Sequence, residues 1–312
     1  MPMDGVTLGF IARETEPLIL GGRIDKVTQP EKDTILILIR AGSENRRLLL
    51  CASPNNARCH LTTANAANPL EPPMFCMLLR KQLTSGRVLS LKQIGGDRVL
   101  HLTMDTVDEM GDHVTRTLIL EVMGRNSNLI LVGDNDKIID AVRHVSLDMS
   151  RVRQIQPGLT YAPPPGQDKL DPASADAAVI LERLQSLSGT PLNKAIGATL
   201  TGCSPQAARE LCFRMTGAAS AMPTAEELPA IAEKLADFLR RMPDMTAPVV
   251  QTDESGDPSD VFPFPYLSCD TSRQLPCDSL SGTMEKYFGV RDRKDRIDQK
   301  SASLVRLLKT HI

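Results

Sequence analysis

Hydrophobic and polar positions in the first half of the chain follow the pattern of short β-strands. Runs rich in Ile, Leu and Val are separated by turns that contain Gly, Pro, Asn or Asp, which is typical of antiparallel hairpins. Two stretches with helical spacing interrupt these runs, from Gly5 to about Leu20 and in PPMFCMLLRKQL. The strand-like runs are RIDKVTQ, ILILIR, RRLLLCAS, VLHLTMD, VTRTLILEV, NLILV and KIIDAVRHV. The pattern predicts a mixed domain of helices and antiparallel sheet.

The second half changes to the periodicity of helices. Pro163 to Pro165 and the polar residues after them indicate a domain boundary, because proline is stiff and has no backbone N–H to donate. Four amphipathic segments follow, separated by Gly or Pro: VILERLQSL, PLNKAIGATL, SPQAARELCFRM and ELPAIAEKLADFLRRM. We therefore predict an α+β protein with one domain over residues 1–165 and an all-α domain over 166–285.

Two segments near the end of the chain have distinct compositions. Residues 243–265 are rich in proline and acidic side chains and are predicted to form a loop within the second domain. Residues 286–312 alternate basic and acidic side chains, which is typical of a solvated helix or the start of a coiled coil. Because this last segment stops without a cap, we expect the natural protein to continue.

An internal repeat relates the first two helix-and-strand units. A shift of 64 positions (86 minus 22) matches GRI at 22–24 to GRV at 86–88, and it also matches Gln29 to Gln93 and Asp33 to Asp97. A true duplication and two unrelated hairpins of similar composition explain these matches equally well. Either way, Arg98 falls opposite Thr34 and has no counterpart in the first unit.

The segment LILEVMGRNSNLILV, residues 118–132, carries the most unusual polar group. Two strand-like runs flank Gly-Arg-Asn-Ser-Asn, which predicts a hairpin. Glu121 lies in phase with the apolar Ile119 and Met123, so it either leaves the sheet face or is a partly buried carboxylate that needs a partner. The turn adds Arg125, Asn126, Ser127 and Asn128. Polar groups thus converge on a rigid β support.

A second candidate site lies where two predicted helices meet. In LTGCSP, Gly202 suits a left-handed helix exit, Ser204 an N-cap and Pro205 the first helical position. Free N–H groups at such a helix start can bind a phosphate, which makes Gly202 and Ser204 candidate phosphate contacts. An ordinary turn between two packed helices is the alternative.

Composition limits the classes of function. The chain of 312 residues has a formal net charge of -2, so any contact with nucleic acid must come from a local basic patch. It has no Trp, three Tyr and seven Phe, too few aromatic rings for a platform that stacks bases. The seven cysteines show no C-x-x-C pair, and no cofactor or metal is expected. Without an export signal or a long apolar run, the protein is predicted to be cytoplasmic and not to enter a membrane.

The sequence also lacks the motifs of common catalytic sites. It contains no phosphate-binding loop, no H-E-x-x-H and no G-x-S-x-G, and its strand histidines are interpreted as structural. What remains is Asp97-Arg98, Glu121 and the Gly-Arg-Asn-Ser-Asn turn. An arginine beside an acid, with amide and hydroxyl donors, suits the binding of a polyanion. A buried structural pair between Glu121 and an arginine is the alternative.

Several long segments resemble one family. DGVTLGFIARE, PPMFCMLLRKQL, GGDRVL, EVMGRNSNLILV and MSRVRQIQPGLTYAPPP are similar to the N-terminal module of the NFACT family, which includes bacterial RqcH, proteins called fibronectin-binding protein A, and the eukaryotic NEMF type. TGCSPQAAREL, SLSGTMEKYF and RDRKDRI resemble its helix-hairpin-helix segment and the entry to its coiled coil. The resemblance covers essentially the whole chain.

The resemblance implies a factor of ribosome-associated quality control that is not an enzyme. Such proteins bind the large ribosomal subunit with a stalled peptidyl-tRNA, recruit tRNA, alanyl-tRNA in bacteria, and promote template-free tailing of the nascent chain. The family's Asp-Arg motif falls on Asp97-Arg98, and its Glu-Ile-Met motif falls on Glu121-Val122-Met123, with Val in place of Ile. The predicted RNA-binding residues are Asp97, Arg98, Glu121, Val122, Met123, Arg125, Asn126, Ser127 and Asn128.

The resemblance also suggests two other functions. The family's first domain is similar in fold to formamidopyrimidine-DNA glycosylases, which use an N-terminal proline amine, an adjacent glutamate and usually a zinc finger. Here Pro2 is followed by Met3 and no zinc pattern exists, which disfavours a glycosylase. A surface adhesin that binds fibronectin is disfavoured by the missing export signal.

Overall fold

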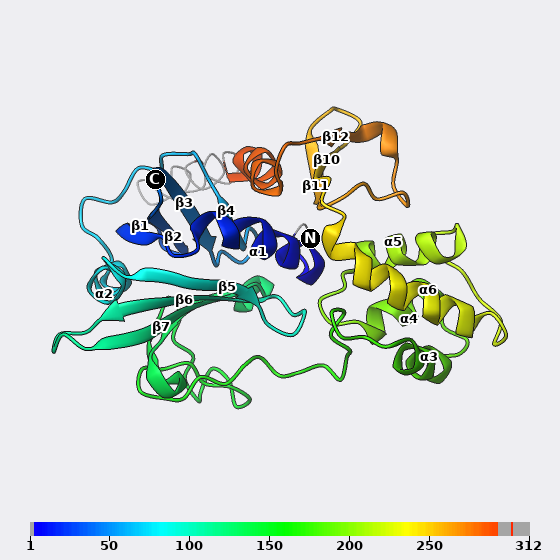
Figure 1. The fold of residues 1–312 in the computed structure, drawn as a ribbon, viewed down its shortest axis with the longest axis horizontal. Helices are drawn as coiled ribbons and strands as arrows, with labels where there is room; N and C mark the ends of the chain where they lie inside the picture. The colour runs from blue at the N-terminus through cyan, green and yellow to red at the C-terminus, as the bar shows by residue number, and fades with distance from the viewer. Residues whose placement is uncertain (1–2, 293–300, 302–312) are drawn as a thin grey trace, which may run out of the picture.

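The computed structural model describes residues 3–292 and residue 301. Its first part is a nine-stranded antiparallel sheet with strand order β4-β3-β2-β1-β5-β6-β7-β8-β9, and two helices pack on it (Figure 1). The helices are α1 (Gly5–Ile19) and α2 (Met74–Leu83). The strands are β1 (Arg23–Glu31), β2 (Thr34–Ala41), β3 (Glu44–Cys51), β4 (Arg58–Leu61), β5 (Arg87–Gln93), β6 (Val99–Val107), β7 (His113–Glu121), β8 (Asn128–Val132) and β9 (Ile138–Ala141). The predicted mixed domain of helices and antiparallel sheet is confirmed.

The sheet has an internal two-fold arrangement that supports the duplication. Each half begins with a helix, and the helix ends Ile19 and Leu83 are 64 positions apart. β1 and β5 meet at the centre of the sheet, where Arg23 lies opposite Arg87, its own counterpart in the repeat. Both strands then have a register shift at the equivalent place, after Ile24 in β1 and after Val88 in β5. Two hairpins that were similar only in composition would not share these irregularities.

Side chains alternate between the two faces of the sheet, so each face carries its own cluster of buried residues. The main core combines one face of β2, β3, β7 and β8 with α1, and its residues include Leu8, Ile37, Leu50, Leu120 and Leu131. The opposite face of β6 to β9 carries a smaller cluster that includes Ile119, Ile130 and Ile155. Ile155 comes from the polar connection after β9, which folds back and pairs with Val145. Each buried side chain of this size contributes about 1.5–3 kcal/mol to stability.

The second part of the chain contains the four predicted helices, α3 (Ala177–Ser186), α4 (Leu192–Thr199), α5 (Pro205–Thr216) and α6 (Leu228–Arg241). Its all-α prediction is wrong in one respect, because residues 243–265 are not simply a loop. They contain β10 (Val249–Thr252) and β11 (Pro258–Phe262), which form a three-stranded sheet with β12 (Gln274–Pro276). The prolines stand at strand ends, where a missing N–H is tolerated, so they did not prevent strand formation.

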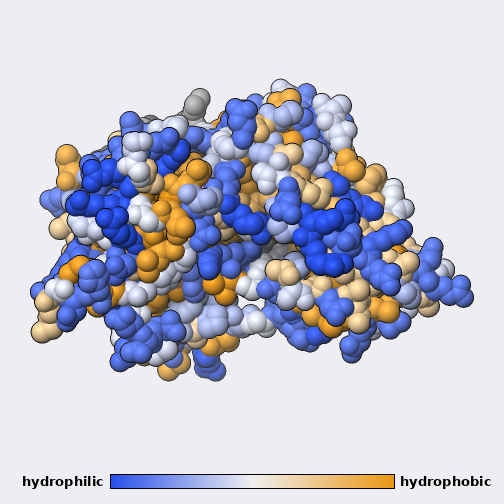
Figure 2. Space-filling model, in the orientation of Figure 1, coloured by the Kyte–Doolittle hydropathy of each residue, from blue (hydrophilic) through white to orange (hydrophobic). Residues whose placement is uncertain are grey.

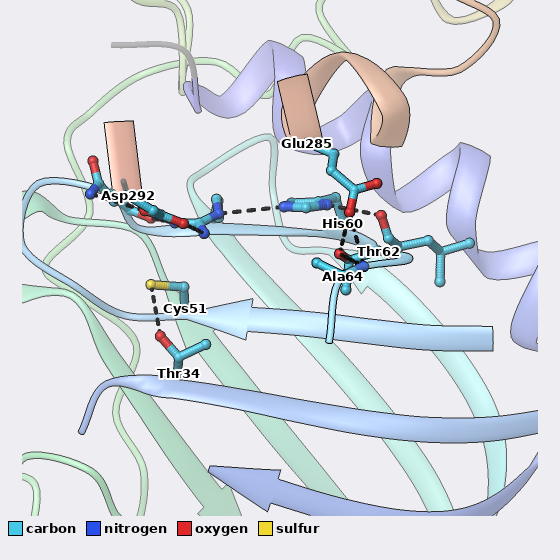
Figure 3. A network of polar contacts seen from close by, with 10 residues as sticks. Thr34, Cys51, His60, Thr62, Ala64, Glu285 and Asp292 are labelled. Atoms are coloured by element: carbon cyan, nitrogen blue, oxygen red, sulfur yellow. Dashed lines mark hydrogen bonds and ion pairs between the residues drawn. The ribbon is translucent and has the colours of Figure 1, made fainter. Parts of the chain in front are cut away.

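A last helix, over residues 280–292, packs back onto the first domain (Figure 1). Glu14 of α1 accepts hydrogen bonds from the N–H groups of Leu280 (2.6 Å) and Ser281 (2.8 Å), the kind of acidic cap that a helix start favours. Glu285 accepts hydrogen bonds from the Thr62 hydroxyl (2.6 Å) and the Ala64 N–H (3.1 Å) beyond β4, as Figure 3 shows. The predicted boundary between residues 285 and 286 therefore falls inside one continuous helix.

The remainder of the predicted coiled-coil segment, residues 293–300 and 302–312, lies outside the described residues, as does Pro2. Within the part of the chain that the structure describes, no helix is both long and apolar enough to span a membrane.

Candidate functional site at the domain junction

The hairpin between β7 and β8 forms as predicted. Glu121 pairs with Asn128 across the two strands, and a single 3-10 turn, Gly124–Asn126, connects them. Gly124 has a φ of +56°, a left-handed conformation that glycine adopts without a steric penalty. The Ser127 hydroxyl accepts the N–H of Met123 at 2.8 Å and closes the loop. These bonds give the turn a defined shape.

Glu121 is the buried end of an ion pair. Its side chain is 1% exposed, and its two carboxylate oxygens accept hydrogen bonds from Arg153 Nη1 (2.8 Å) and Nη2 (2.5 Å). Tyr161 donates its hydroxyl to the same carboxylate at 2.8 Å, and burial together with this negative charge raises the pKa of Tyr161. The bidentate arginine and the phenol satisfy the carboxylate fully. The structure thus shows the buried pair that the alternative interpretation expects, and a contact of Glu121 with RNA stays a prediction.

Three more of the predicted RNA-binding residues are buried. Val122, Ser127 and Asn128 are at most 2% exposed. The Asn128 amide donates to the Arg143 carbonyl oxygen (2.8 Å) and accepts from the Arg143 N–H (3.0 Å), so it serves to hold the next segment in place. Their side chains are thus buried in the structure, and their contact with RNA stays a prediction. The predicted residues that remain accessible are Asp97, Arg98, Met123, Arg125 and Asn126.

The β5–β6 turn presents Asp97 and Arg98. Gly95 and Gly96 have φ values of +57° and +69°, which lets the chain reverse tightly. The Asp97 carboxylate accepts the N–H of Arg98 at 2.7 Å, and the Arg98 carbonyl oxygen accepts the N–H of Val122 at 2.9 Å. The turn is therefore bonded to the β7–β8 hairpin. Arg98 itself is half-buried, and its guanidinium makes no ion pair with any residue that the structure describes.

The turn between α4 and α5 joins the two domains. Gly202 has a φ of +67°, and a Cβ atom there would lie 2.1 Å from the Gly96 carbonyl oxygen and 2.8 Å from the Gly5 Cα atom. The Gly5 N–H donates to the Gly202 carbonyl oxygen at 2.8 Å. Three segments thus meet through three glycines, and any side chain at position 202 would push them apart.

Ser204 caps α5 as predicted, but its hydroxyl is already engaged. It accepts the N–H of Ala207 (3.2 Å) and donates to the carboxylate of Asp4 (2.5 Å), which caps α1 through the N–H of Thr7. Burial raises the pKa of Asp4, and the hydrogen bonds from Ser204 and Thr7 oppose that shift. The glycine is thus packed against backbone and the hydroxyl faces a carboxylate, while the phosphate contacts of Gly202 and Ser204 stay a prediction.

These elements enclose a groove of about 490 Å³, which we call the junction groove. Arg98 stands in one wall and Lys169 in another, and the Lys169 ammonium donates to the Gly197 carbonyl oxygen at 2.9 Å. Figure 2 shows hydrophilic side chains of both domains bordering the boundary between them. The groove is lined by Asp4, Asp97, Arg98, Met123, Pro164, Pro165, Gln167, Lys169, Thr201, Gly202, Cys203, Ser204 and Pro205.

The junction groove unites two sites that the sequence suggested separately. Asp97, Arg98 and Met123 come from the sheet, whereas Gly202 and Ser204 come from the helical turn. Arg125 and Asn126 are exposed beside the hairpin but do not line the groove. Lys169, Arg153 and Tyr161 were not predicted, although Arg153 and Tyr161 lie in MSRVRQIQPGLTYAPPP, which resembles the NFACT N-terminal module. Among the described residues, no cluster of His, Cys, Asp or Glu could hold a metal ion.

The fold and this groove define a protein with a sheet domain and a helical domain joined at a rigid turn. Comparison with known families agrees, since residues 4–312 match the model of the NFACT N-terminal and middle domains. The chain therefore belongs to the NFACT family.

Curated relatives share the same stretch. The Rqc2 homolog RqcH of Bacillus subtilis (strain 168) is 34% identical over 309 residues, covering 99% of this chain and 52% of the relative. The ribosome quality control complex subunit NEMF of Mus musculus is 30% identical over 138 residues, covering 44% of this chain and 12% of the relative. The chain thus spans about half the length of the bacterial relatives that it matches.

Solved structures show the same architecture. The fibrinogen binding protein from Staphylococcus aureus superposes with a TM-score of 0.77 at 31% identity, over 92% of this chain and 99% of that one. The N-terminal part of the fibronectin/fibrinogen-binding protein from Streptococcus suis gives a TM-score of 0.75 at 30% identity, over 92% and 98% of the two chains.

Proposed function

We propose that the protein is a cytoplasmic factor of ribosome-associated quality control. In this role it binds the large ribosomal subunit that carries a stalled peptidyl-tRNA and recruits tRNA, alanyl-tRNA in bacteria, for template-free tailing of the nascent chain. The observation that carries the proposal is Arg98, a cation without an ionic partner among the described residues, held on a bonded turn in one wall of the junction groove. Relatives named for ribosome quality control support the assignment.

The junction groove has the chemistry of RNA recognition. A guanidinium can donate two parallel hydrogen bonds to a phosphate or to a guanine edge, so Arg98 can both hold and orient a nucleotide. Lys169 adds a second positive charge from the facing domain. Because the formal net charge is -2, attraction of RNA must come from such local cations. The volume of about 490 Å³ suits one or two nucleotides rather than a whole duplex.

The contacts in the groove favour binding over catalysis. The Ser204 hydroxyl is hydrogen bonded to a buried carboxylate rather than to a histidine that could activate it. A glycosylase would use an N-terminal proline followed by a glutamate. Here Met3 stands in place of that glutamate, and its side chain is fully buried in the core. We therefore infer an RNA-binding factor that is not a glycosylase.

Two solved relatives are named for binding fibrinogen or fibronectin, which provides a competing proposal for the same surface. The two proposals differ in how binding responds to salt. Binding of RNA through phosphates weakens steeply as salt increases, because each neutralised phosphate releases counterions. A protein ligand held by a mixed apolar and polar surface responds far less.

The test is tRNA binding by the full-length protein over a salt series, with Asp97 and Arg98 both changed to Ala. Because Arg98 is inferred to contact a phosphate, we expect a loss of about tenfold or more in affinity and a smaller salt slope, by about 1. Arg46→Ala is the matched control, because Arg46 is a partly exposed arginine that pairs with Glu44 on β3, remote from the groove. Unchanged tRNA affinity in the double variant would contradict the proposal. The proposal would also be contradicted if the unchanged protein bound fibronectin and the double variant lost that binding instead.

A further inference from the structure

Gln93 occupies a position that the binding site described above does not use. It ends β5, and its side-chain amide donates two hydrogen bonds to backbone carbonyl oxygens, one to Gly5 at 2.6 Å and one to Asp97 at 2.8 Å. Gly5 begins α1, and Asp97 precedes Arg98 in the β5–β6 turn. One amide thus ties the start of a helix to the turn that carries Arg98.

The same amide lies next to the contact between the two domains. The Gly5 N–H donates to the Gly202 carbonyl oxygen, so Gly5 receives a bond from Gln93 on one side and gives one to the helical turn on the other. Space for the amide is built into α1, because a Cβ atom at Gly9 would lie 2.5 Å from the Gln93 Oε1 atom. Gln93 therefore sets how the β5–β6 turn sits against both walls of the junction groove.

The internal repeat supplies a comparison within the same molecule. Gln29, the counterpart of Gln93, donates its amide to the carbonyl oxygen of Lys32 at 2.7 Å, so it anchors the equivalent turn of the first unit. Among the described residues, no hydrogen bond joins the Gln29 side chain to the helical domain, and its turn carries Thr34 where the second unit has Arg98. Both units use a glutamine to hold a turn. Only Gln93 also bonds α1, and its turn is the one that lines the junction groove.

We infer that Gln93 is a positioning residue for RNA binding. By bonding Gly5 and Asp97 together, it fixes the distance between Arg98 on the turn and the α4–α5 wall of the junction groove. An RNA phosphate then meets an arginine that is already in place, which spares the cost of ordering the turn on binding. This inference rests on the proposed function and adds to it a residue that touches no RNA.

The test compares Gln93→Met with Gln29→Met in the full-length protein. Both variants remove an amide that donates to backbone in the sheet domain, so both lower thermal stability, and Gln29→Met controls for that general effect. We expect Gln93→Met to lower tRNA affinity about fivefold to tenfold, while Gln29→Met keeps the affinity of the unchanged protein. If Gln93→Met does not fold, Gln93→Asn is used instead, because its amide is one methylene too short to reach both carbonyl oxygens. The same loss of tRNA affinity is then expected.

A double variant separates this inference from the proposed function. In protein that already carries Arg98→Ala, adding Gln93→Met has no further effect on affinity if Gln93 acts through Arg98. Normal binding by Arg98→Ala alone would reject the proposed function. Weakened binding by Arg98→Ala together with normal binding by Gln93→Met would overturn only the role of Gln93. The same conclusion would follow if the losses of affinity from Arg98→Ala and Gln93→Met multiplied in the double variant.

Discussion

Single residues show how burial decides between two interpretations of one sequence feature. A carboxylate in an apolar strand is either a recognition group or a buried ion, and only its partners distinguish the two. Glu121 is bonded by Arg153 and Tyr161, which are 32 and 40 positions further along the chain. Arg98 has no such partner among the described residues. We therefore propose the arginine rather than the glutamate as the recognition residue.

Removal of the Glu121 carboxylate is expected to destabilise the protein strongly. Glu121→Ala leaves the guanidinium of Arg153 mostly buried without its counter-ion, which costs about 3–5 kcal/mol in the free energy of unfolding. Urea denaturation measures the loss. Glu44→Ala, which breaks an exposed ion pair with Arg46, is the control and should cost at most about 1 kcal/mol. Equal, small losses in the two variants would show that the Glu121 pair is not structural.

Sequence could reveal that Glu121 is unusual but not which group satisfies it. The partner Arg153 lies in a polar connection without periodicity, and nothing in its local pattern indicates that it folds onto the outer face of the sheet. The Asp97-Arg98 turn was predicted correctly as a turn, because glycines precede it and strand patterns flank it. Its closeness to Gly202 depends on how two domains dock, and no local pattern encodes that.

At the scale of elements, strands and helices with clear periodicity were predictable, whereas short strands in a proline-rich segment were not. β10 and β11 are only four and five residues long and lie among prolines and acidic residues, a composition that indicates a loop. The sequence indicated where the last helix starts, but not the surface on which it packs. It packs on β4 and the residues after it, more than 200 positions earlier. Glu285 bonds Thr62, as Figure 3 shows, and Asp292 pairs with Arg58 of β4.

The free energy of unfolding is expected to depend on pH through His60. His60 lies in β4 and is 2% exposed; burial and the neighbouring Arg58 lower its pKa to about 4, although the Leu61 carbonyl oxygen and Glu285 oppose this. The folded-state pKa is thus below the unfolded value of about 6.5. The stabilising contribution is complete above pH 6.5 and is lost as the pH falls towards 4, because the unfolded chain takes up a proton that the folded chain does not.

Each unit of pKa shift corresponds to about 1.4 kcal/mol, so the loss attributable to His60 is on the order of 3 kcal/mol. Denaturation of the unchanged protein and of His60→Gln at pH 7 and pH 4.5 measures it. The variant should lose much less stability between the two pH values. His113→Gln, at an exposed histidine paired with Asp105, is the control. An identical pH dependence in His60→Gln and the unchanged protein would refute this assignment.

The whole molecule combines a duplicated sheet with a helical domain across a junction of glycines. Gly5, Gly96 and Gly202 bring the backbones so close that a Cβ atom at any of the three would lie within 2.6 Å of another segment. The repeat created two equivalent turns, and only the second of them faces the helical domain. The candidate site thus depends on domain docking as much as on the identity of its residues.

The most direct measurement of the central claim is site-specific crosslinking in the full-length protein bound to tRNA on large ribosomal subunits. A photoreactive amino acid replaces Met123, which lines the junction groove, or Met110, which is 88% exposed in the turn between β6 and β7. If the groove binds RNA, position 123 crosslinks to tRNA, and Arg98→Ala abolishes that crosslink while position 110 remains silent. Crosslinking of tRNA from position 110 and not from position 123 would contradict the claim.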